Sequence, residues 1–430
     1  MLPTESTRIP RRRWRIAWLL GIGVLVNYFD RVNLSVSKEA LTVSFGITAV
    51  TFGWLSGAYS FTYAALQLPI GVILDKFGIR RVGRLSTFLW SIASFAAAIS
   101  SGLTGLFGAR LLLGVGEAST FPANAKAIGS WFPPEERSFA TSINDSAAKF
   151  SSALGVPLLG MILIGLGWRW SFVATGVISF AYFLLFWAVY RDPLHDPHLT
   201  ETELAYIAGK PAAELASTPR PPTPSFTSLL RQRKVWGLFL GFGAYNYTFY
   251  LLLTWLPSYL FASMKMSQMQ SFLYTGFPWV VATITDMAVG GWLTDSLIQR
   301  GFNPNRVRKT ILVTGMTFGL GIFGAAYTHS TLTALIWISI SIGGVSAAAP
   351  IGWSIPSLIA PRASVGTVGG IANFASQISA ICAPVLTGYI FQATHSFAWA
   401  FAVAAAYIVV GIFGYTVLMG PIEQMDLDSA

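Results

Sequence analysis

Charged residues lie inside long apolar segments of this sequence, where a membrane protein tolerates few of them. These residues are Asp30 with Arg31, Arg110 with Glu117, Asp145 with Lys149, and Asp286. A charge in hydrocarbon is costly, so such side chains normally face a polar cavity or each other. A guanidinium binds a carboxylate through two parallel hydrogen bonds, and a buried carboxylate readily exchanges a proton. Together these types indicate an anion-binding site with a proton-transfer group.

Spacing relates two of these charges. Arg110 and Glu117 are seven residues apart and therefore share one helix face. Protonation of Glu117 would free an arginine for an anion, and the alternative is a permanent Arg110–Glu117 ion pair. Arg31 lies about 16 residues, or roughly 24 Å, into its segment, too deep to reach the surface easily. It either binds substrate or is only neutralised by Asp30 or Glu117.

Asp145 and Lys149 are four residues apart, a spacing that favours an ion pair within one helix. Lys149 either provides an extra positive contact, for a second carboxylate or a bulkier acid, or only neutralises Asp145. Asp286 has no assigned role at this stage.

The segments that carry these charges are predicted transmembrane helices. The chain has 430 residues, 53% hydrophobic and 11% charged, whereas soluble proteins have roughly 25% charged residues. Apolar runs of about 20 residues are long enough to cross a bilayer as helices. We predict an all-α membrane protein with twelve spans, at 15–37, 49–74, 82–100, 103–127, 138–164, 168–190, 233–260, 267–296, 307–328, 331–357, 362–391 and 395–418.

The chain is predicted to consist of two similar halves. Residues 1–190 form an N-terminal six-helix bundle, 191–232 a cytoplasmic linker rich in Pro, Ser and Thr, and 233–430 a C-terminal six-helix bundle. The segment 71–81 (GVILDKFGIRR) is echoed by 291–295 (GWLTD) and the basic residues that follow, so that Asp75 corresponds to Asp295. Two parallel repeats of six spans are typical of transporters whose site lies between the two lobes.

The distribution of basic residues predicts orientation and excludes nucleic acid as a partner. The net charge is +10, but most basic residues fall in loops on one side, which places both termini in the cytoplasm. The four histidines lie in loops or at span ends, so carboxylates must carry any proton, and the single cysteine, Cys382, lies in a span. No grouping of nucleophile and base or of metal ligands stands out in the spans, and we expect no enzyme activity, cofactor or metal.

Several motifs carry a resemblance to a known family. Segment 71–81 resembles the loop signature of the major facilitator superfamily. Four further motifs resemble one family of that superfamily, the anion:cation symporters. They are residues 27–35 (NYFDRVNLS), 110–118 (RLLLGVGEA), 131–133 (WFP) with Glu136-Arg137, and 245–250 (YNYTFY). That family includes bacterial galactonate, glucarate and hexuronate carriers and the animal sialic-acid carrier sialin. The resemblance covers nearly the whole chain.

The resemblance implies roles for individual residues. It makes Arg31 the contact for the substrate anion, and Glu117 and Asp30 coupling residues, with Arg110 beside them. It also makes Tyr28, Tyr63, Trp353 and Asn373 cavity residues. From their positions in the spans, Tyr245, Asn246 and Lys149 are expected to line the same cavity, and ordinary helix packing is the alternative for each aromatic or amide residue. Close relatives often have a glutamine at the position of Ala148, so this chain departs from the family beside Lys149.

Asp75, Arg80, Arg81 and Asp295 are expected to form gating ion pairs at the cytoplasmic ends of the spans. Such pairs would lock the outward-facing state and break when the cytoplasmic side opens. A static role in membrane topology is the alternative.

These observations predict a monomeric, proton-coupled symporter of a bacterial inner membrane that imports an organic anion by alternating access. The expected substrate is a sugar acid, namely an aldonate, aldarate or hexuronate, and the alternative is another small carboxylate. A proton-driven drug antiporter would need a cavity of acidic and apolar residues, which Arg31 and Arg110 disfavour. Phosphate-ester exchange would need a basic residue in the seventh span, where none follows Lys234.

Overall fold

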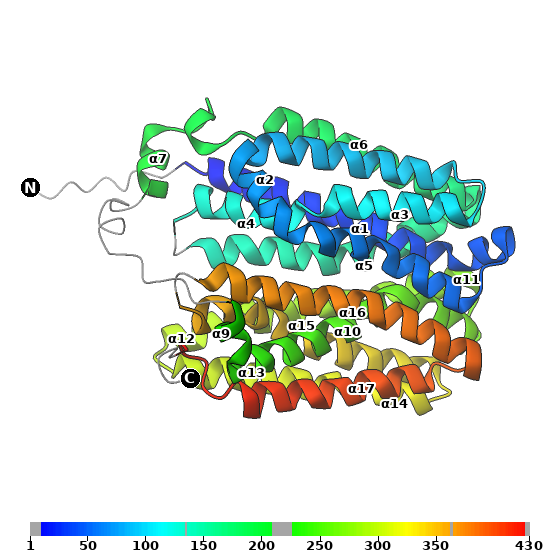
Figure 1. Cartoon of the computed structure of the whole chain (residues 1–430). Coiled ribbons are helices and arrows are strands. Elements are labelled where there is room, and N and C mark those ends of the chain that lie inside the picture. Colours follow the sequence, from blue (N-terminus) through cyan, green and yellow to red (C-terminus); the bar gives the residue numbers. More distant parts are fainter. Residues whose placement is uncertain (1–9, 134–135, 209–225, 362–363, 426–430) are drawn as a thin grey trace, which may run out of the picture.

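The computed structural model describes residues 10–133, 136–208, 226–361 and 364–425, and this part of the chain is helical, without a strand. The helices form two bundles that lie side by side along their lengths (Figure 1). Apolar segments in a bilayer become helices because every backbone N–H and C=O must be satisfied within the segment. The predicted fold, twelve transmembrane helices in two six-helix bundles, is confirmed.

The first bundle contains six spans. Its helices are α1 (Arg12–Phe45), α2 (Ala49–Ala98), α3 (Leu103–Glu117), α4 (Thr120–Trp131), α5 (Arg137–Leu166) and α6 (Trp168–Val189). Helix α2 provides two spans, because the chain turns at Gly78, whose φ of 77° is open to glycine. Helices α3 and α4 together make one span, which is interrupted between Glu117 and Thr120.

The second bundle also has interrupted spans. Its helices are α10 (Arg233–Ala262), α11 (Gln268–Thr285), η3 (Asp286–Leu293), α12 (Thr294–Gln299), α13 (Pro304–Gly319), α14 (Ile322–Tyr327), α15 (Thr331–Ile359), α16 (Val365–Thr394), α17 (Ala398–Phe413) and η5 (Gly414–Leu418). Segment η3 is a π-helix in the middle of the eighth span. Such wide turns are frequent at functional sites, and this one begins at a charged residue, Asp286.

Seven of the described helical segments are long and apolar enough to cross a membrane. The number becomes eight if the bent helix α2 is added as one further segment. The remaining spans are less apolar or broken. Helices α1 and α10 bury many polar and aromatic side chains, among them Asn27, Asp30 and Arg31 in α1. The α3–α4 span is interrupted. Spans that look less like membrane helices, such as α1 and α10, therefore carry polar groups into the interior.

The bundles pack tightly against each other at one end of the molecule. A Cβ atom added to Gly53 of α2 would lie 2.6 Å from the carbonyl oxygen of Pro384 in α16, and one added to Gly276 of α11 would lie 2.8 Å from that of Ala153 in α5. Ser35 also donates a hydrogen bond to the carbonyl of Thr254 across the interface, at 2.7 Å. Small residues allow such close helix approach in membranes. We call this the closed end.

The opposite end carries the linker helices η2 (Pro193–His195), α7 (Glu201–Ala208) and α9 (Phe226–Arg231) (Figure 1). Arg13 at the start of α1 forms ion pairs with Glu136 (2.6 Å) and with Glu203 of α7 (3.0 Å), and Arg12 pairs with Asp196 (2.8 Å). The hydrogen bond from Arg13 lowers the pKa of Glu136, which lies just before α5. These contacts attach α7 to the first bundle. We call this the linker end.

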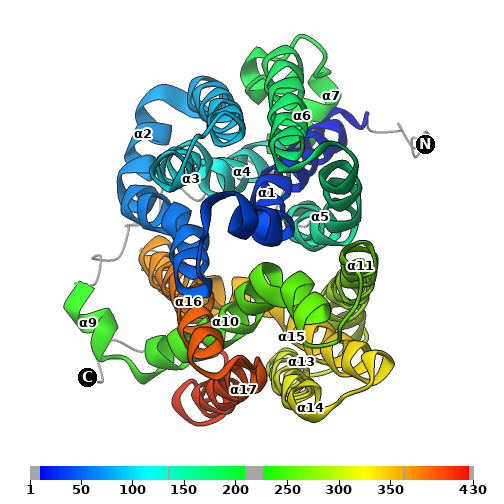
Figure 2. The ribbon, with the colours of Figure 1, turned by 90° about the vertical axis from the view of Figure 1, so that its right-hand side faces the viewer.

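Helix α6 ends at Val189 and α10 begins at Arg233, while residues 209–225 of the predicted linker lie outside the described residues. Viewed along the helices, each bundle forms one group and the two groups face each other (Figure 2). Helices α1, α2 and α5 of the first bundle face α10, α11 and α16 of the second.

Candidate functional site

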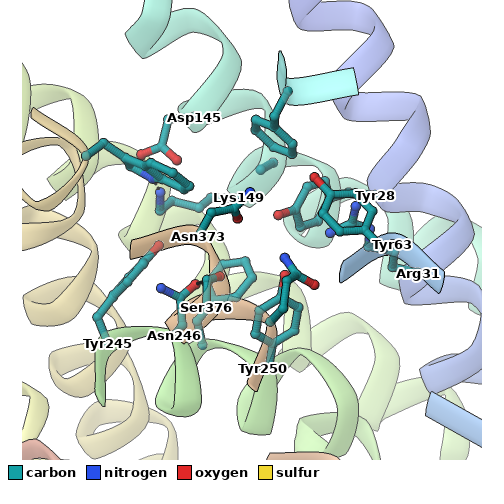
Figure 3. A pocket seen from close by; sticks show the side chains of 15 residues that line it. Tyr28, Arg31, Tyr63, Asp145, Lys149, Tyr245, Asn246, Tyr250, Asn373 and Ser376 are labelled. Atoms are coloured by element: carbon teal, nitrogen blue, oxygen red, sulfur yellow. Dashed lines mark hydrogen bonds and ion pairs between the residues drawn. The ribbon is translucent and has the colours of Figure 1, made fainter. Parts of the chain in front are cut away.

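A cavity lies between the bundles and is lined by residues from both. All of the predicted binding residues line it: Tyr28, Arg31, Tyr63, Lys149, Tyr245, Asn246, Trp353 and Asn373. Arg31, Tyr28 and Tyr63 gather at one side, whereas Lys149, Asp145 and Tyr245 lie at the other (Figure 3). We call these the arginine pole and the lysine pole. Their role in binding stays a prediction, but the fold brings the predicted residues together.

The arginine pole is built around one buried ion pair. Arg31 contacts a single oxygen of Glu117, with Nη2 and Nε at 2.8 and 2.9 Å from Oε2. Their side chains are 4% and 0% exposed. A buried pair of this kind is held because neither charge is tolerated alone. The other carboxylate oxygen, Oε1, has no hydrogen-bond partner among the described residues, so the site has an unused acceptor where a proton could bind.

Aromatic rings surround the guanidinium of Arg31. Its Cζ lies 4.4 Å from the ring centre of Tyr28, 4.9 Å from that of Tyr59 and 5.7 Å from that of Tyr63. The electron-rich faces of these rings stabilise a cation that has left water. Tyr59 is missing from the sequence prediction. The signal for it was its position four residues before Tyr63, on the same helix face.

Arg110 lies behind the arginine pole, toward the closed end. Its Nη1 donates to the backbone carbonyl of Asp30 at 3.4 Å, and its Cζ lies 5.0 Å from the ring centre of Tyr59. Its Nε has no hydrogen-bond partner among the described residues. The cationic partner of Glu117 is Arg31, so the shared helix face of Arg110 and Glu117 does not produce the alternative Arg110–Glu117 ion pair in this conformation. Arg110 and Arg31 also line a second, smaller cavity.

Asp30 points away from the cavity, although it adjoins Arg31 in sequence. Its carboxylate accepts hydrogen bonds from Ser94 of α2 (2.5 Å) and Ser179 of α6 (2.9 Å). Consecutive helix residues lie on different faces, which is why the two neighbours have separate surroundings. Asp30 is therefore a buried carboxylate held by hydroxyl groups, and Glu117 is the carboxylate that neutralises Arg31.

The lysine pole contains a partner that sequence reasoning missed. Lys149 Nζ lies 2.9 Å from Asp145 Oδ2, as the spacing predicts, and 2.7 Å from Asp286 Oδ2 of the other bundle. The side chains of Lys149 and Asp286 are each 1% exposed, whereas Asp145 is 17% exposed. The only signal for Asp286 was a lone carboxylate in an apolar span, which predicts an unseen partner.

The second bundle contributes amides and aromatic rings. Asn373 donates to Oε1 of Gln67 in the first bundle at 2.7 Å, and the ring of Trp353 stacks on that of Phe121 in α4 with centres 6.4 Å apart. Asn246 accepts a hydrogen bond from Ser376 at 2.8 Å, which fixes its amide at the cavity wall. Phe121, Phe249, Tyr250, Ser376 and Gln377 also line the cavity, and none is in the predicted binding set.

The predicted gating residues lie away from the cavity. Asp75 forms an ion pair with Lys126 of α4 at 2.5 Å, in which the two side chains are 79% and 40% exposed. Lys126 was not predicted as a partner, and an exposed pair of this kind contributes little stability. Arg81 and Asp295 are exposed and Arg80 is partly buried. Gating by these four residues stays a prediction. Among the described residues, no group of His, Cys, Asp and Glu could hold a metal ion.

Two helical bundles around a central, charged cavity define a secondary transporter of the membrane. The chain belongs to the Major Facilitator Superfamily, whose sequence model matches residues 20–384. It is 39% identical over 416 residues to an uncharacterized transporter, YybO, of Bacillus subtilis, with 96% of each chain covered. It is 30% identical to a D-galactonate transporter of Escherichia coli, with 99% of each covered. A probable galactarate/D-glucarate transporter, GarP, of Escherichia coli is 31% identical, with 98% of each covered.

Solved structures support the same fold. A bacterial homolog of the human lysosomal transporter Spinster, in an inward-facing and occupied conformation, superposes with a TM-score of 0.74 at 16% identity, covering 94% of this chain and 96% of the other. A D-xylose-proton symporter gives a TM-score of 0.70 at 17% identity, covering 96% and 99%. These structures show the fold, whereas the family model and the sequence relatives confirm the family that the motifs indicate.

Proposed function

We propose that this protein is a proton-coupled symporter that imports a sugar acid by alternating access. The observation that carries this proposal is the buried Arg31–Glu117 ion pair at one pole of a cavity lined by both bundles. The guanidinium of Arg31 already binds the carboxylate of Glu117, so the carboxylate of a substrate can compete with Glu117 for it. The names of the relatives, which include galactonate and galactarate/D-glucarate transporters, favour a sugar acid as the competitor.

The proposed coupling follows from charge balance. While Glu117 is ionised it occupies Arg31, and a substrate anion would add an uncompensated charge. A proton on Glu117 releases Arg31, which then binds the substrate carboxylate, with tyrosine, Asn246, Trp353 and Asn373 side chains around the sugar chain. Arg110 and Asp30 act behind this pole, and Asp30 is a second proton site. Inward proton movement offsets the membrane potential, which opposes anion uptake by about 2.3 kcal/mol per charge per 100 mV.

The conformation fits a stage of such a cycle. The bundles touch closely at the closed end, through residues such as Gly53 and Gly276. With both termini in the cytoplasm, the closed end faces outward and the cavity is reached from inside. Asp75, Arg80, Arg81 and Asp295 would then form their gating contacts in the outward-facing state, and Asp75 pairs with Lys126 in this one. The protein acts as a monomer in the bacterial inner membrane.

Binding to purified protein tests the proposal first. A thermal-shift panel of aldonates, aldarates, hexuronates and simple carboxylates should find stabilisation by at least one sugar acid, since a ligand that binds the folded state stabilises it by mass action. Reconstituted protein should then accumulate that acid when an inward proton gradient is imposed, and a protonophore should abolish accumulation. Stabilisation by simple carboxylates alone would favour the other small carboxylates, and accumulation without a proton gradient would contradict proton coupling.

A further inference from the structure

The lysine pole joins the two bundles through three charges of which two are negative. Lys149 and Asp145 belong to α5 of the first bundle, whereas Asp286 begins the π-helix η3 of the second. The carboxylate oxygens lie 2.9 and 2.7 Å from the one Nζ atom. The amine donates a hydrogen bond to Asp145 and forms a close ion pair with Asp286, so one positive charge already has two carboxylate partners.

We propose, resting on the function proposed above, that Asp286 and Asp145 make the lysine pole a selectivity element. This element admits sugar acids with one anionic end and disfavours those with two. The far end of an admitted acid is a hydroxyl group, whose oxygen can accept a hydrogen bond from Lys149. The substrate class that fits this arrangement is the aldonate.

The net charge of the lysine pole disfavours a second substrate carboxylate. With both carboxylates ionised, the pole has one more negative than positive charge, and if the two carboxylates share one proton it is neutral. In neither state does a second substrate carboxylate meet a net positive charge. The side chains of Lys149 and Asp286 are 1% exposed, so water screens these charges weakly. Of the two alternatives for Lys149, contact with a second substrate carboxylate is disfavoured because Asp286, distant in sequence, already pairs with the amine.

The arginine pole and the lysine pole face each other across one cavity (Figure 3). A sugar acid whose carboxylate binds Arg31 extends its other end toward the lysine pole. Even at roughly 10 Å, in an effective dielectric of about 20, one charge changes affinity by about tenfold, and a substrate carboxylate in contact with the lysine pole would lie nearer. The lysine pole can thus distinguish a terminal hydroxymethyl group from a terminal carboxylate.

The test compares galactonate with galactarate, which differ at carbon 6 alone, by measuring the dissociation constants of both for purified protein. Wild type should bind galactonate about tenfold more tightly or better. Asp286→Asn should reduce this preference by about tenfold. The variant leaves Lys149 paired with Asp145, so no buried charge is stranded. Asp145→Asn should have the same effect through the partly exposed partner, and it is the second variant if Asp286→Asn does not fold.

Glu423→Gln is the matched control. It removes the same charge from a 68% exposed side chain whose partner is Lys234, at 4.0 Å, and should leave the preference unchanged. Equal binding of the two acids by wild type, or an unchanged preference in both Asp variants, would overturn the inference while leaving sugar-acid transport intact. Failure of wild type to bind either acid or any other sugar acid would instead contradict the proposed function.

Discussion

Arg31 is the residue at which binding and coupling meet in the proposed mechanism. It has one carboxylate partner, Glu117, and three tyrosine rings around it. The rings hold the guanidinium in place whether or not the carboxylate stays, because their attraction for a cation does not depend on a proton. Exchange of Glu117 for a substrate carboxylate therefore needs no large movement of Arg31.

Replacement of Arg31 separates charge from geometry. Arg31→Lys keeps the charge but loses the planar fork, and we expect the substrate dissociation constant to rise about tenfold to a hundredfold, as for the loss of a hydrogen bond to a charged group. Arg31→Ala should abolish both transport and substrate-induced stabilisation in protein that still inserts and purifies. Isothermal titration calorimetry, with the sugar acid that the thermal-shift panel identifies, measures the dissociation constants of both variants. Arg191→Lys at the linker end is the control, and wild-type affinity in Arg31→Ala would remove this residue from the site.

Glu117→Gln imitates the protonated carboxyl group. We expect it to keep substrate binding and exchange of labelled for unlabelled acid, because Arg31 stays available. Uphill accumulation driven by a pH gradient should be lost, because the side chain can no longer release a proton. Proteoliposome uptake with and without the gradient measures both. Normal accumulation in this variant would assign coupling to another carboxylate, with Asp30 the next to test.

At the scale of elements, closure of one end depends on helices that approach through small residues. Gly53 of α2 lies against the backbone at Pro384 of α16, and Gly388 of α16 lies against that at Ala49. Backbone atoms cannot rotate aside as a flexible side chain can. The contact between α2 and α16 is therefore expected to respond sharply to added volume.

Gly53→Leu should prevent full closure of the closed end. An added Cβ would lie 2.6 Å from the Pro384 carbonyl oxygen and 2.9 Å from Cα of Val385, so we expect the uptake rate to fall by about tenfold or more, since overpacking costs roughly 1–3 kcal/mol. A cysteine at Ser258, in a Cys382→Ser background, should react faster with a membrane-impermeant thiol reagent applied from outside. Gly108→Leu, where no atom lies within 4 Å, is the control. Unchanged uptake and labelling would show that this contact does not limit closure.

At the scale of the whole molecule, part of the linker moves with the first bundle. Helix α7 is joined to α1 through Glu203 and Arg13, and Arg13 also binds Glu136 before α5. Glu203 is fully buried, so its separation from Arg13 would strand a charge. We infer that α1, α5 and α7 move as one body in the proposed alternating-access cycle.

The ion pair between Arg13 and Glu136 should weaken in acid. The bond from Arg13 lowers the pKa of Glu136 below its unfolded value, near 4.5. A lowered folded-state pKa contributes stability that is present above the unfolded pKa and is lost as the pH falls through the folded pKa. Wild type should therefore melt above Glu136→Gln at pH 7, and the difference in Tm should shrink as the pH falls below about 4.5. Glu423→Gln is the control, and a difference independent of pH would mean that ionisation of Glu136 does not matter.

Much of the fold could be predicted because apolar runs of membrane length have few alternatives to a helix. The positions of Arg31, Glu117 and Lys149 inside such runs marked the site before any neighbour was known. Lys126 could not be predicted as the partner of Asp75. It lies on an ordinary helix face, and its relevance depends on which helix packs there.

The sequence by itself determined the twelve spans, the two halves and the set of charges that a membrane interior must accommodate, because hydropathy and spacing along one helix are local properties. Asp145 with Lys149 is such a local pair. Only the tertiary structure decided that Glu117 pairs with Arg31, that Asp30 turns to two serines, and that Asp286 crosses to Lys149. Those partners come from different helices, and the rotation of one helix against another is determined by packing of the whole bundle rather than by either segment alone.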